Sequence, residues 1–364
     1  MAGEGARSRV VPCLPERVAL SDSPRRPKNE TMSIPGILPC QAIEALIASG
    51  AITADVAFDS DQVQPASLDL RLGPTAWRVR ASFLPGAGRK VADRIAGVAM
   101  HKLDLSAGAV LEKGCVYLVE VAERLALPPG VSARANPKSS TGRVDVFVRL
   151  LTDYGEAFDD VASGYSGPLY LEIAPQTFSV LVRAGTRLNQ LRLKAGDPPR
   201  VTVTNIGVDL TGAIAGYRAR RHAGVIDLDR EAALDLADFW EALEPRRGEL
   251  LLDPGEFYIL ASKEDIAIPA LQAAEMTPID PAVGEFRVHY AGFFDPGFGV
   301  DEAHGAGSKG VLEVRSHTPF LLEDGQTVAR LVFEPLTERP ARLYGEGGSH
   351  YQKQGLKLSK HFKS

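Results

Sequence analysis

The chain has 364 residues, of which 45% are hydrophobic and 24% charged, which excludes a wholly disordered, collagen-like or coiled-coil protein. Its net charge of −5, from 41 basic and 46 acidic residues, argues against a long nucleic acid as partner. Three widely spaced cysteines form neither a disulfide framework nor a CxxC zinc pair, so we expect a reducing, cytoplasmic setting. No apolar run approaches the roughly 18 residues of a membrane helix, so no membrane partner is expected.

The first 31 residues are rich in Arg, Pro and Ser and have neither the apolar core nor the cleavage site of a signal peptide. We therefore expect a disordered N-terminal extension over residues 1–31, with Met32 as an alternative start; a basic binding arm is the other interpretation. The following segment, 39–49, places Ile43, Leu46 and Ile47 on one face and is followed by Gly50, which predicts a helix.

The remaining chain contains an internal repeat with an offset of about 140 residues, and this repeat decides its organisation. The repeat is clearest in three pairs of segments: 64–81 with 203–221, 111–130 with 252–271, and 170–193 with 311–334. Two homologous units therefore run from about 62 to 194 and from about 202 to 334.

Within each unit, short runs of alternating apolar and polar residues are separated by Gly and Pro every eight to twelve residues or so, which predicts an all-β fold. We expect a first β domain over 32–198, a second over 199–340 and a C-terminal tail over 341–364. A second helix is expected over 230–243, because its apolar residues recur with helical spacing.

Several motifs in this framework carry candidate chemistry. PKSSTGR, residues 137–143, has backbone N–H groups, hydroxyls and two cations that can bind phosphate, although a plain turn between strands has the same composition. FFDPGFG, residues 293–299, reads as a type I turn. PGAGRK, residues 85–90, lacks the ending of a phosphate loop and is expected to be a plain loop. The basic run 218–222 is expected to be a solvated edge or a subunit contact.

Taken in order, QPASLDLRLG, PKSSTGR, YLE, VRAGTRLNQL, FFDPGFG and the C-terminal SHYQKQG resemble the dCTP deaminases of the trimeric dUTPase superfamily, in a tandem, double-length form. The resemblance implies two dUTPase-like β-clip or jelly-roll units with a few short helices. It also implies hydrolysis of dCTP to dUTP and ammonia in dUMP and dTTP biosynthesis, with Mg²⁺ on the triphosphate and no zinc. The H-x-E and P-C-x-x-C signature of zinc deaminases is absent. Threefold closure of a duplicated chain implies a homotrimer with six β units.

The resemblance also assigns roles to residues. A partly buried carboxylate shuttles protons in this reaction, and the matching positions are Glu172 and its repeat counterpart Glu313. Ser139 and Ser140 also position the attacking water, Asp295 binds the 3′-hydroxyl, and the tail closes over the nucleotide as a flexible lid. The residues expected to bind the substrate are Lys138, Ser139, Ser140, Thr141, Gly142, Arg143, Asp295, Tyr344, His350 and Gln354.

Neither copy carries every motif, so two arrangements of the site stay open. In a composite site, the SSTGR turn of the first unit faces the DPG hairpin, Glu313 and the tail. In a first-unit site, Glu172 is the base and Asp159 or Asp160 binds the sugar; the sequence slightly favours Glu172, because SSTGR and YLE share a unit. The alternative functions are a dUTPase or a bifunctional enzyme that forms dUMP, and a noncatalytic nucleotide-binding regulator.

Overall fold

Short alternating runs with β-branched and leucine side chains form strands here, because each run buries one face and exposes the other. The computed structural model describes residues 34–199, 202–279, 286–289, 292–300, 307–346 and 351–363, with the backbone alone for 286–289. The expected N-terminal extension lies outside the described residues. Residues 34–364 form one compact unit, so the domain boundaries at 198/199 and 340/341 stay a prediction. Below, residues 34–199 are called the first half, 202–340 the second half and 341–364 the tail.

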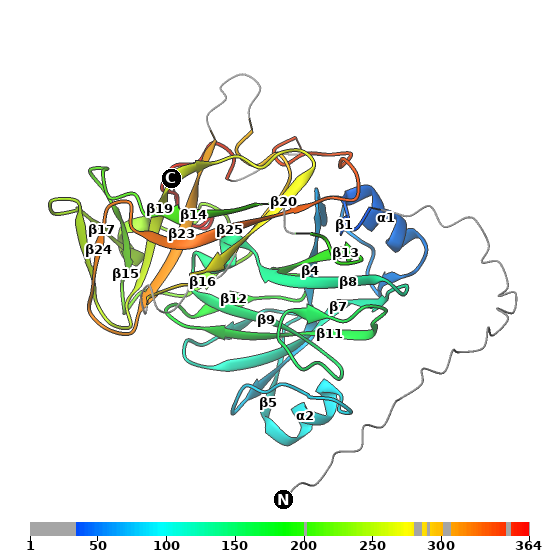
Figure 1. Ribbon diagram of the computed structural model, residues 1–364. Helices are drawn as coiled ribbons and strands as arrows, with labels where there is room; N and C mark the ends of the chain where they lie inside the picture. Colours follow the sequence, from blue (N-terminus) through cyan, green and yellow to red (C-terminus); the bar gives the residue numbers. More distant parts are fainter. Residues whose placement is uncertain are drawn as a thin grey trace, which may run out of the picture. The chain divides into compact units, whose positions relative to one another are not determined.

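The first half is built mainly of antiparallel strands (Figure 1). The described residues form a branched sheet whose main path runs β10-β8-β13-β4-β7-β11-β9. The strands of the first half are β1 (Gly36–Ile37), β2 (Ile52–Ala54), β3 (Val63–Gln64), β4 (Ser67–Val79), β5 (Ala99–Asp104), β6 (Ala109–Leu111), β7 (Val116–Ala126), β8 (Val131–Pro137), β9 (Val146–Thr152), β10 (Asp160–Val161), β11 (Ser166–Pro175), β12 (Val180–Val182) and β13 (Arg187–Ala195). Of these, β6 and β12 lie in a separate small sheet with β16 of the second half.

The second half repeats these pairings. As β11 lies between β7 and β9, so β23 lies between β19 and β21. Its strands are β14 (Thr202–Gly207), β15 (Gly216–Ala219), β16 (Ile226–Asp227), β17 (Trp240–Leu243), β18 (Glu249–Leu252), β19 (Phe257–Ile266), β20 (Gln272–Pro278), β21 (Phe286–His289), β22 (Phe293–Phe294), β23 (Ser308–Ser316), β24 (Phe320–Glu323) and β25 (Thr327–Pro335). The all-β prediction is confirmed.

Strand β4 carries the QPASLDLRLG motif and joins two parts of the first-half sheet. Its beginning pairs with β13, its end pairs with β5 and β7, and the register with β7 shifts between Leu72 and Ala76. Gly73 lies at this shift, where a Cβ atom would come within 2.5 Å of the Glu120 carbonyl oxygen. A side chain there would separate β4 from β7, which explains the glycine that ends the motif.

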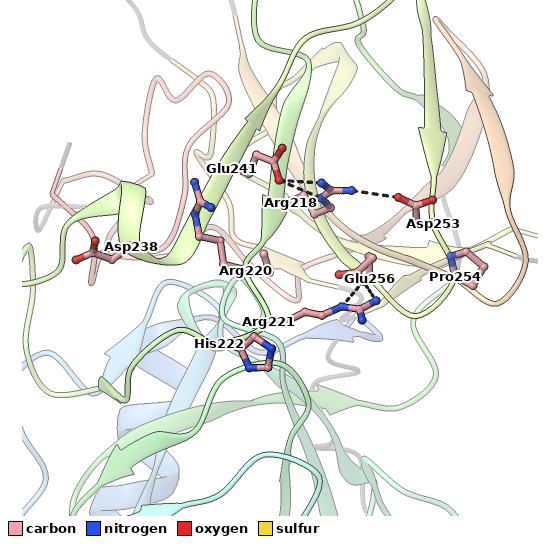
Figure 2. A pocket seen from close by; sticks show the side chains of 10 residues that line it. Arg218, Arg220, Arg221, His222, Asp238, Glu241, Asp253, Pro254 and Glu256 are labelled. Atoms are coloured by element: carbon pink, nitrogen blue, oxygen red, sulfur yellow. Dashed lines mark hydrogen bonds and ion pairs between the residues drawn. The ribbon is translucent and has the colours of Figure 1, made fainter.

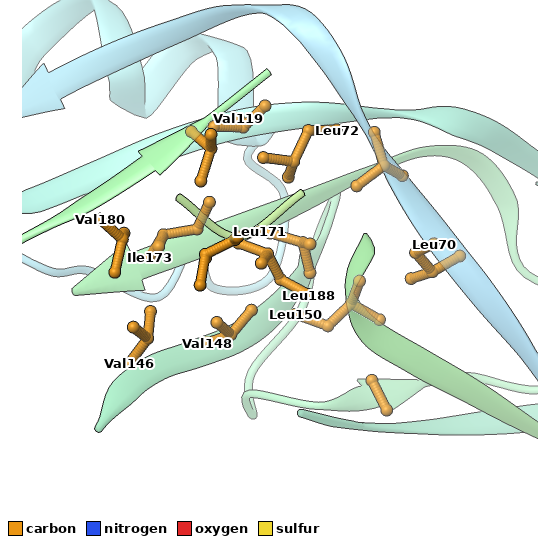
Figure 3. Packing of buried hydrophobic residues seen from close by; sticks show 14 of the residues in the cluster. Leu70, Leu72, Val119, Val146, Val148, Leu150, Leu171, Ile173, Val180 and Leu188 are labelled. Carbon is orange, nitrogen blue, oxygen red and sulfur yellow. The ribbon is translucent and has the colours of Figure 1, made fainter. Parts of the chain in front are cut away.

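The hydrophobic core is shared by the two halves. In the first half, Leu72, Leu150 and Leu171 are among the residues that fill the space between the strands (Figure 3). The same cluster continues into the second half, where the Trp240 ring lies 5.5 Å from that of Phe178, centroid to centroid. Strand β12 also pairs in parallel with β16, so backbone hydrogen bonds accompany the shared core.

The helices only partly follow the sequence prediction. Helix α1 (Cys40–Ala48) is confirmed, and α3 (Ser139–Gly142) is a single turn. Helix α2 (Val91–Val98), which packs near β5 in Figure 1, follows PGAGRK and was not predicted. The helix expected over 230–243 is wrong: only α4 (Leu236–Phe239) is helical, and β17 follows it directly.

The error over 230–243 has a tertiary cause. Trp240 pairs with Ala219 across β15 and β17, and its side chain is almost fully buried against Phe178 and Phe257. Apolar residues whose spacing suggests a helix therefore lie partly on the edge strand β17. Strand pairing and burial of the side chains outweigh the local preference for a helix.

Within the described ranges, no helix is long and apolar enough to cross a membrane.

Because one cluster serves both halves, we expect Phe178→Ala to destabilise the whole compact unit by about 3–5 kcal/mol, the usual cost of such a cavity. Denaturant unfolding followed by Trp fluorescence and by far-UV circular dichroism should shift to lower denaturant together. A shift in only one of the two signals would contradict a shared core.

Candidate active site

A cavity of about 940 Å³ lies between the first half, the second half and the tail. This volume is within the usual range for a nucleotide-sized ligand. Nine of the expected site residues line it: Lys138, Ser139, Ser140, Thr141, Arg143, Asp295, Glu313, Tyr344 and Gln354. The cavity thus brings together residues that the composite arrangement names, and which of the two arrangements is used stays a prediction.

The PKSSTGR motif begins where β8 ends and forms the first-half wall of the cavity. The residues after Lys138 turn helically, because the N–H groups of Thr141 and Gly142 both donate to the Lys138 carbonyl. Ser140 and Arg143 are buried against the tail, whereas Ser139 is half-buried. Gly142 supports this turn without lining the cavity.

One end of the cavity is rich in charge. The Lys138 ammonium lies 2.5 Å from Oδ2 of Asp69, and the Arg187 guanidinium lies 3.7 Å from the same oxygen. Arg187 also donates to Asp61 at 2.9 Å and holds the pKa of that carboxyl below its usual range. Asp69 and Arg187 were not predicted as site residues, although both lie in motifs that carried the resemblance, QPASLDLRLG and VRAGTRLNQL. Two cations facing the cavity suit a polyanionic ligand.

Glu313 lies on β23, opposite Ile259 of β19 and His289 of β21. Its side chain lines the cavity and is only 5% exposed. Burial raises its pKa to about 8, while the nearby Arg143 guanidinium acts in the opposite direction. A carboxyl group with such a pKa can give and take a proton near neutral pH.

Glu172, the repeat counterpart, lies outside the cavity lining. On β11 it faces Arg149 of β9, and the guanidinium Nη2 lies 2.5 Å from Glu172 Oε1. The same guanidinium stacks 3.7 Å from the ring centroid of Phe158. In the second half, the position opposite the glutamate is occupied by His289 rather than by an arginine. The first-half carboxylate is therefore held in a buried ion pair, and its catalytic role stays a prediction.

Asp295 forms the second-half wall with the DPG hairpin. Its side chain is buried, and burial raises its pKa while Arg192 opposes the shift. At Gly297, where φ is 92°, a Cβ atom would lie 2.9 Å from Cβ of Leu343, so the hairpin packs closely on the start of the tail. The backbone N–H of Tyr344 donates to the Pro296 carbonyl at 2.8 Å.

The other two candidates for sugar binding lie elsewhere. Asp159 is half-buried, desolvation raises its pKa to about 7, and its carboxylate accepts a hydrogen bond from the Leu150 N–H at 2.7 Å. Asp160 is exposed on β10. Neither residue lines the cavity. The sugar-binding residues expected for the first-unit arrangement are therefore not in the cavity that the SSTGR turn lines.

The tail contacts the SSTGR turn directly. Ser359 Oγ donates to the Ser140 carbonyl at 2.8 Å, and Arg143 Nη1 donates to the Lys357 carbonyl at 2.9 Å. The Arg143 guanidinium also stacks 4.0 Å from the ring centroid of Tyr351. The described part of the tail therefore closes the cavity in this structure, whereas His350 lies outside the described residues.

Gln354 and Phe362 fix the tail at two further points. The Gln354 side-chain amide donates to the Lys309 carbonyl at 2.8 Å, and its oxygen is buried without a hydrogen bond among the described residues. The Phe362 ring lies 5.4 Å from that of Phe239 and 5.9 Å from that of Trp240. The end of the tail is thus part of the hydrophobic core, which the expectation of a flexible lid did not include.

A second hollow of about 680 Å³ contains the basic run 218–222 (Figure 2). Arg218 is bound between Glu241 at 2.8 Å and Asp253 at 3.1 Å, and Arg221 pairs with Glu256. Figure 2 shows these acids interleaved with the arginines. Three arginines meet four acidic residues among the side chains that line this hollow, so its charge does not favour an anion.

No group of three or more His, Cys, Asp or Glu side chains in the described part of the chain is arranged to hold a metal ion.

Comparison with known proteins places the chain in one family. Residues 34–197 match the family model for the 2′-deoxycytidine 5′-triphosphate deaminase N-terminal domain, and residues 199–362 match that for the C-terminal domain. The crystal structure of 2′-deoxycytidine 5′-triphosphate deaminase from Agrobacterium tumefaciens is 52% identical, with a TM-score of 0.81. The match covers 83% of this chain and 99% of that one.

More distant relatives match over a shorter range. The dCTP deaminase of Halorubrum lacusprofundi is 29% identical over 148 residues, which cover 40% of this chain and 70% of the relative. The dUMP-forming dCTP deaminase of Beutenbergia cavernae is 31% identical over 150 residues, 41% of this chain and 74% of the relative. Together, the two matched domains and the cavity between them show that the chain belongs to the dCTP deaminase family, in a double-length arrangement.

Proposed function

We propose that the cavity between the halves hydrolyses dCTP to dUTP and ammonia, with water activated by Glu313 and without zinc. The observation that carries this proposal is the position of a buried carboxyl group of raised pKa beside the SSTGR turn of the other half. Mg²⁺ enters as part of the substrate, bound to the triphosphate. The product would supply dUMP and dTTP synthesis.

The charges of the cavity suggest how the nucleotide is oriented. Lys138 and Arg187 face the cavity from one end and would bind phosphate oxygens with charge-assisted hydrogen bonds. Asp295, on the DPG hairpin, would accept a hydrogen bond from the 3′-hydroxyl of the sugar. The cytosine ring would then lie near Glu313 and Ser140, with the tail covering it and excluding bulk water.

In the reaction, protonated Glu313 donates its proton to N3 of cytosine. The resulting carboxylate removes a proton from a water molecule while the water oxygen bonds to C4, and a Ser139 or Ser140 hydroxyl orients that water. Glu313 then protonates the amino nitrogen, the C4–N4 bond breaks and ammonia leaves. The proton of the C4 hydroxyl returns to Glu313, which leaves a carbonyl at C4. One carboxyl group of pKa near neutrality serves every step.

A second activity is favoured by the names of several relatives. Three of the similar proteins are dUMP-forming dCTP deaminases. In the same cavity, attack of water on the triphosphate would release pyrophosphate and leave dUMP. Separation of the products of dCTP and dUTP by anion-exchange chromatography distinguishes the two reactions, because the simple deaminase leaves dUTP intact.

We also propose that the protein acts in the cytoplasm as a homotrimer with six β units, since threefold closure is the assembly that the resemblance implies.

Glu313→Gln should lower the turnover of dCTP by about 10²-fold or more with little loss of nucleotide binding, because acid–base catalysis is removed while the shape of the side chain is kept. Glu172→Gln is the matched control in the other half and should keep most of the activity. Ammonia release and calorimetric affinity for dCTP measure the two effects. A fully active Glu313→Gln enzyme, or wild-type protein that binds dCTP without releasing ammonia, would favour the noncatalytic alternative.

Stability should depend on pH through the same side chain. Folding raises the pKa of Glu313 from 4.5 to about 8, so its contribution is complete below pH 4.5 and is lost as the pH rises through 8. Relative to Glu313→Gln, the unfolding free energy of the wild type should fall by about 1.4 kcal/mol per pH unit between these values. Denaturant titrations at several pH values measure the difference; a constant difference would mean that Glu313 titrates normally.

Chains with Glu313→Gln and chains with Arg143→Ala should not restore each other when they are co-expressed with different tags. If each site uses both residues of one chain, every site in a mixed assembly lacks one of them. If sites instead formed between chains, about a third of the sites in each mixed trimer would be intact. Activity of the doubly purified mixture near that fraction of wild type would contradict the intrachain site.

A further inference from the structure

Arg192 is an arginine that is fully buried, and its side chain crosses from the first half into the second. It belongs to β13, and its residue exposure is 0%. Nη1 donates to the Ala274 carbonyl at 3.0 Å, and Nη2 lies 3.3 Å from both the Phe294 carbonyl and Asp295 Oδ1. The guanidinium also stacks 3.9 Å from the ring centroid of Phe293. All four partners belong to β20 or to the hairpin that contains Asp295.

The β fold itself does not require this arginine. The repeat aligns Leu191-Arg192-Leu193 with Leu331-Val332-Phe333, so the second half has Val332 at the same strand position. Burying a guanidinium is costly unless its partners compensate, and Nε of Arg192 has no hydrogen bond among the described residues. An apolar side chain fills this position in one half, so the arginine of the other half has a local purpose.

Two of the contacts of Arg192 bear directly on the orientation and charge of Asp295. The guanidinium engages Oδ1 of the carboxylate and the carbonyl of the preceding residue, which fixes the hairpin at the edge of the cavity. Burial raises the pKa of Asp295, and Arg192 is the strongest opposing influence. Within the described structure, the side-chain hydrogen bond of Asp295 uses Oδ1, which leaves Oδ2 to a ligand.

We propose that Arg192, which does not itself line the cavity, is a positioning residue that holds Asp295 as an ionised acceptor for the sugar 3′-hydroxyl and thereby sets the selection against 3′-deoxy nucleotides. The proposal rests on the proposed function of the cavity and adds how its sugar end is built. A neutral or reoriented Asp295 would lose the charge-assisted hydrogen bond that distinguishes the two sugars.

The test compares binding of dCTP with that of 2′,3′-dideoxycytidine triphosphate, which lacks only the 3′-hydroxyl. Calorimetric dissociation constants are measured in the Glu313→Gln background, so that turnover does not interfere. We expect a preference for dCTP of about tenfold or more, as for one hydrogen bond to a charged group. Arg192→Met should reduce this ratio close to one, as should Asp295→Asn, whereas affinity for the dideoxy nucleotide should change little.

Arg149→Met is the matched control, because Arg149 also stacks on a phenylalanine ring and pairs with a buried carboxylate, but away from the cavity. It should leave the ratio at the wild-type value. Arg192→Lys, which keeps the charge, should give an intermediate ratio of the two dissociation constants. It replaces Arg192→Met in the test if a thermal melt shows that the methionine variant is not folded. A ratio that stays at the wild-type value in folded Arg192→Met or Arg192→Lys protein would overturn the proposal, as would a preference absent from the Glu313→Gln parent.

Failure of the proposed function would look different. If wild-type protein released no ammonia from dCTP but the binding ratio still fell in Arg192→Met, the positioning role would stand and the reaction would be wrong. If ammonia were released and the ratio did not move, the reaction would stand and Arg192 would be structural only.

Discussion

Ionisable side chains are buried where the two halves of the chain meet, and cations of one half lie near acidic groups of the other. Arg192 of the first half neutralises Asp295 of the second, and Arg143 acts in the same direction on Glu313. A third contact runs the other way, since Arg315 of β23 binds Asp145 of the first half. A buried charge that loses its partner is strongly destabilising. The halves are therefore held in one relative position by the same groups that line or support the cavity.

The two copies of the repeat have specialised through single side chains placed on similar strands. Each half has a glutamate at the equivalent strand position, Glu172 in the first and Glu313 in the second. The residue opposite it on the neighbouring strand is Arg149 in the first half and His289 in the second. Arg149 pairs with Glu172, whereas burial is the main influence on the pKa of Glu313. On β13 and β25 the exchange is Arg192 against Val332, and Arg192 contacts the hairpin that contains Asp295.

Sequence patterns were sufficient for properties that depend on local order. Alternation and punctuation by Gly and Pro predicted the strands, the apolar face before Gly50 predicted α1, and the motifs named most cavity residues. They were insufficient for properties that depend on which strands, far apart in the sequence, lie next to each other. The slight preference for Glu172 rested on proximity in sequence to SSTGR, and the sequence did not show that β11 directs that side chain to Arg149; which glutamate is the base stays a prediction. The helix predicted over residues 230–243 was wrong because Trp240 pairs with β15 and its side chain is buried in the core, and the sequence shows neither contact.

The carboxyl end of the chain has a consequence for how this architecture can vary. Phe362 packs with the aromatic residues that join the halves, and Ser359 is bonded to the turn that carries Ser140. Loss of the residues around 360 would thus expose part of the hydrophobic core and remove one wall of the cavity together. Insertions or losses near residue 360 therefore carry a double cost that surface termini normally escape.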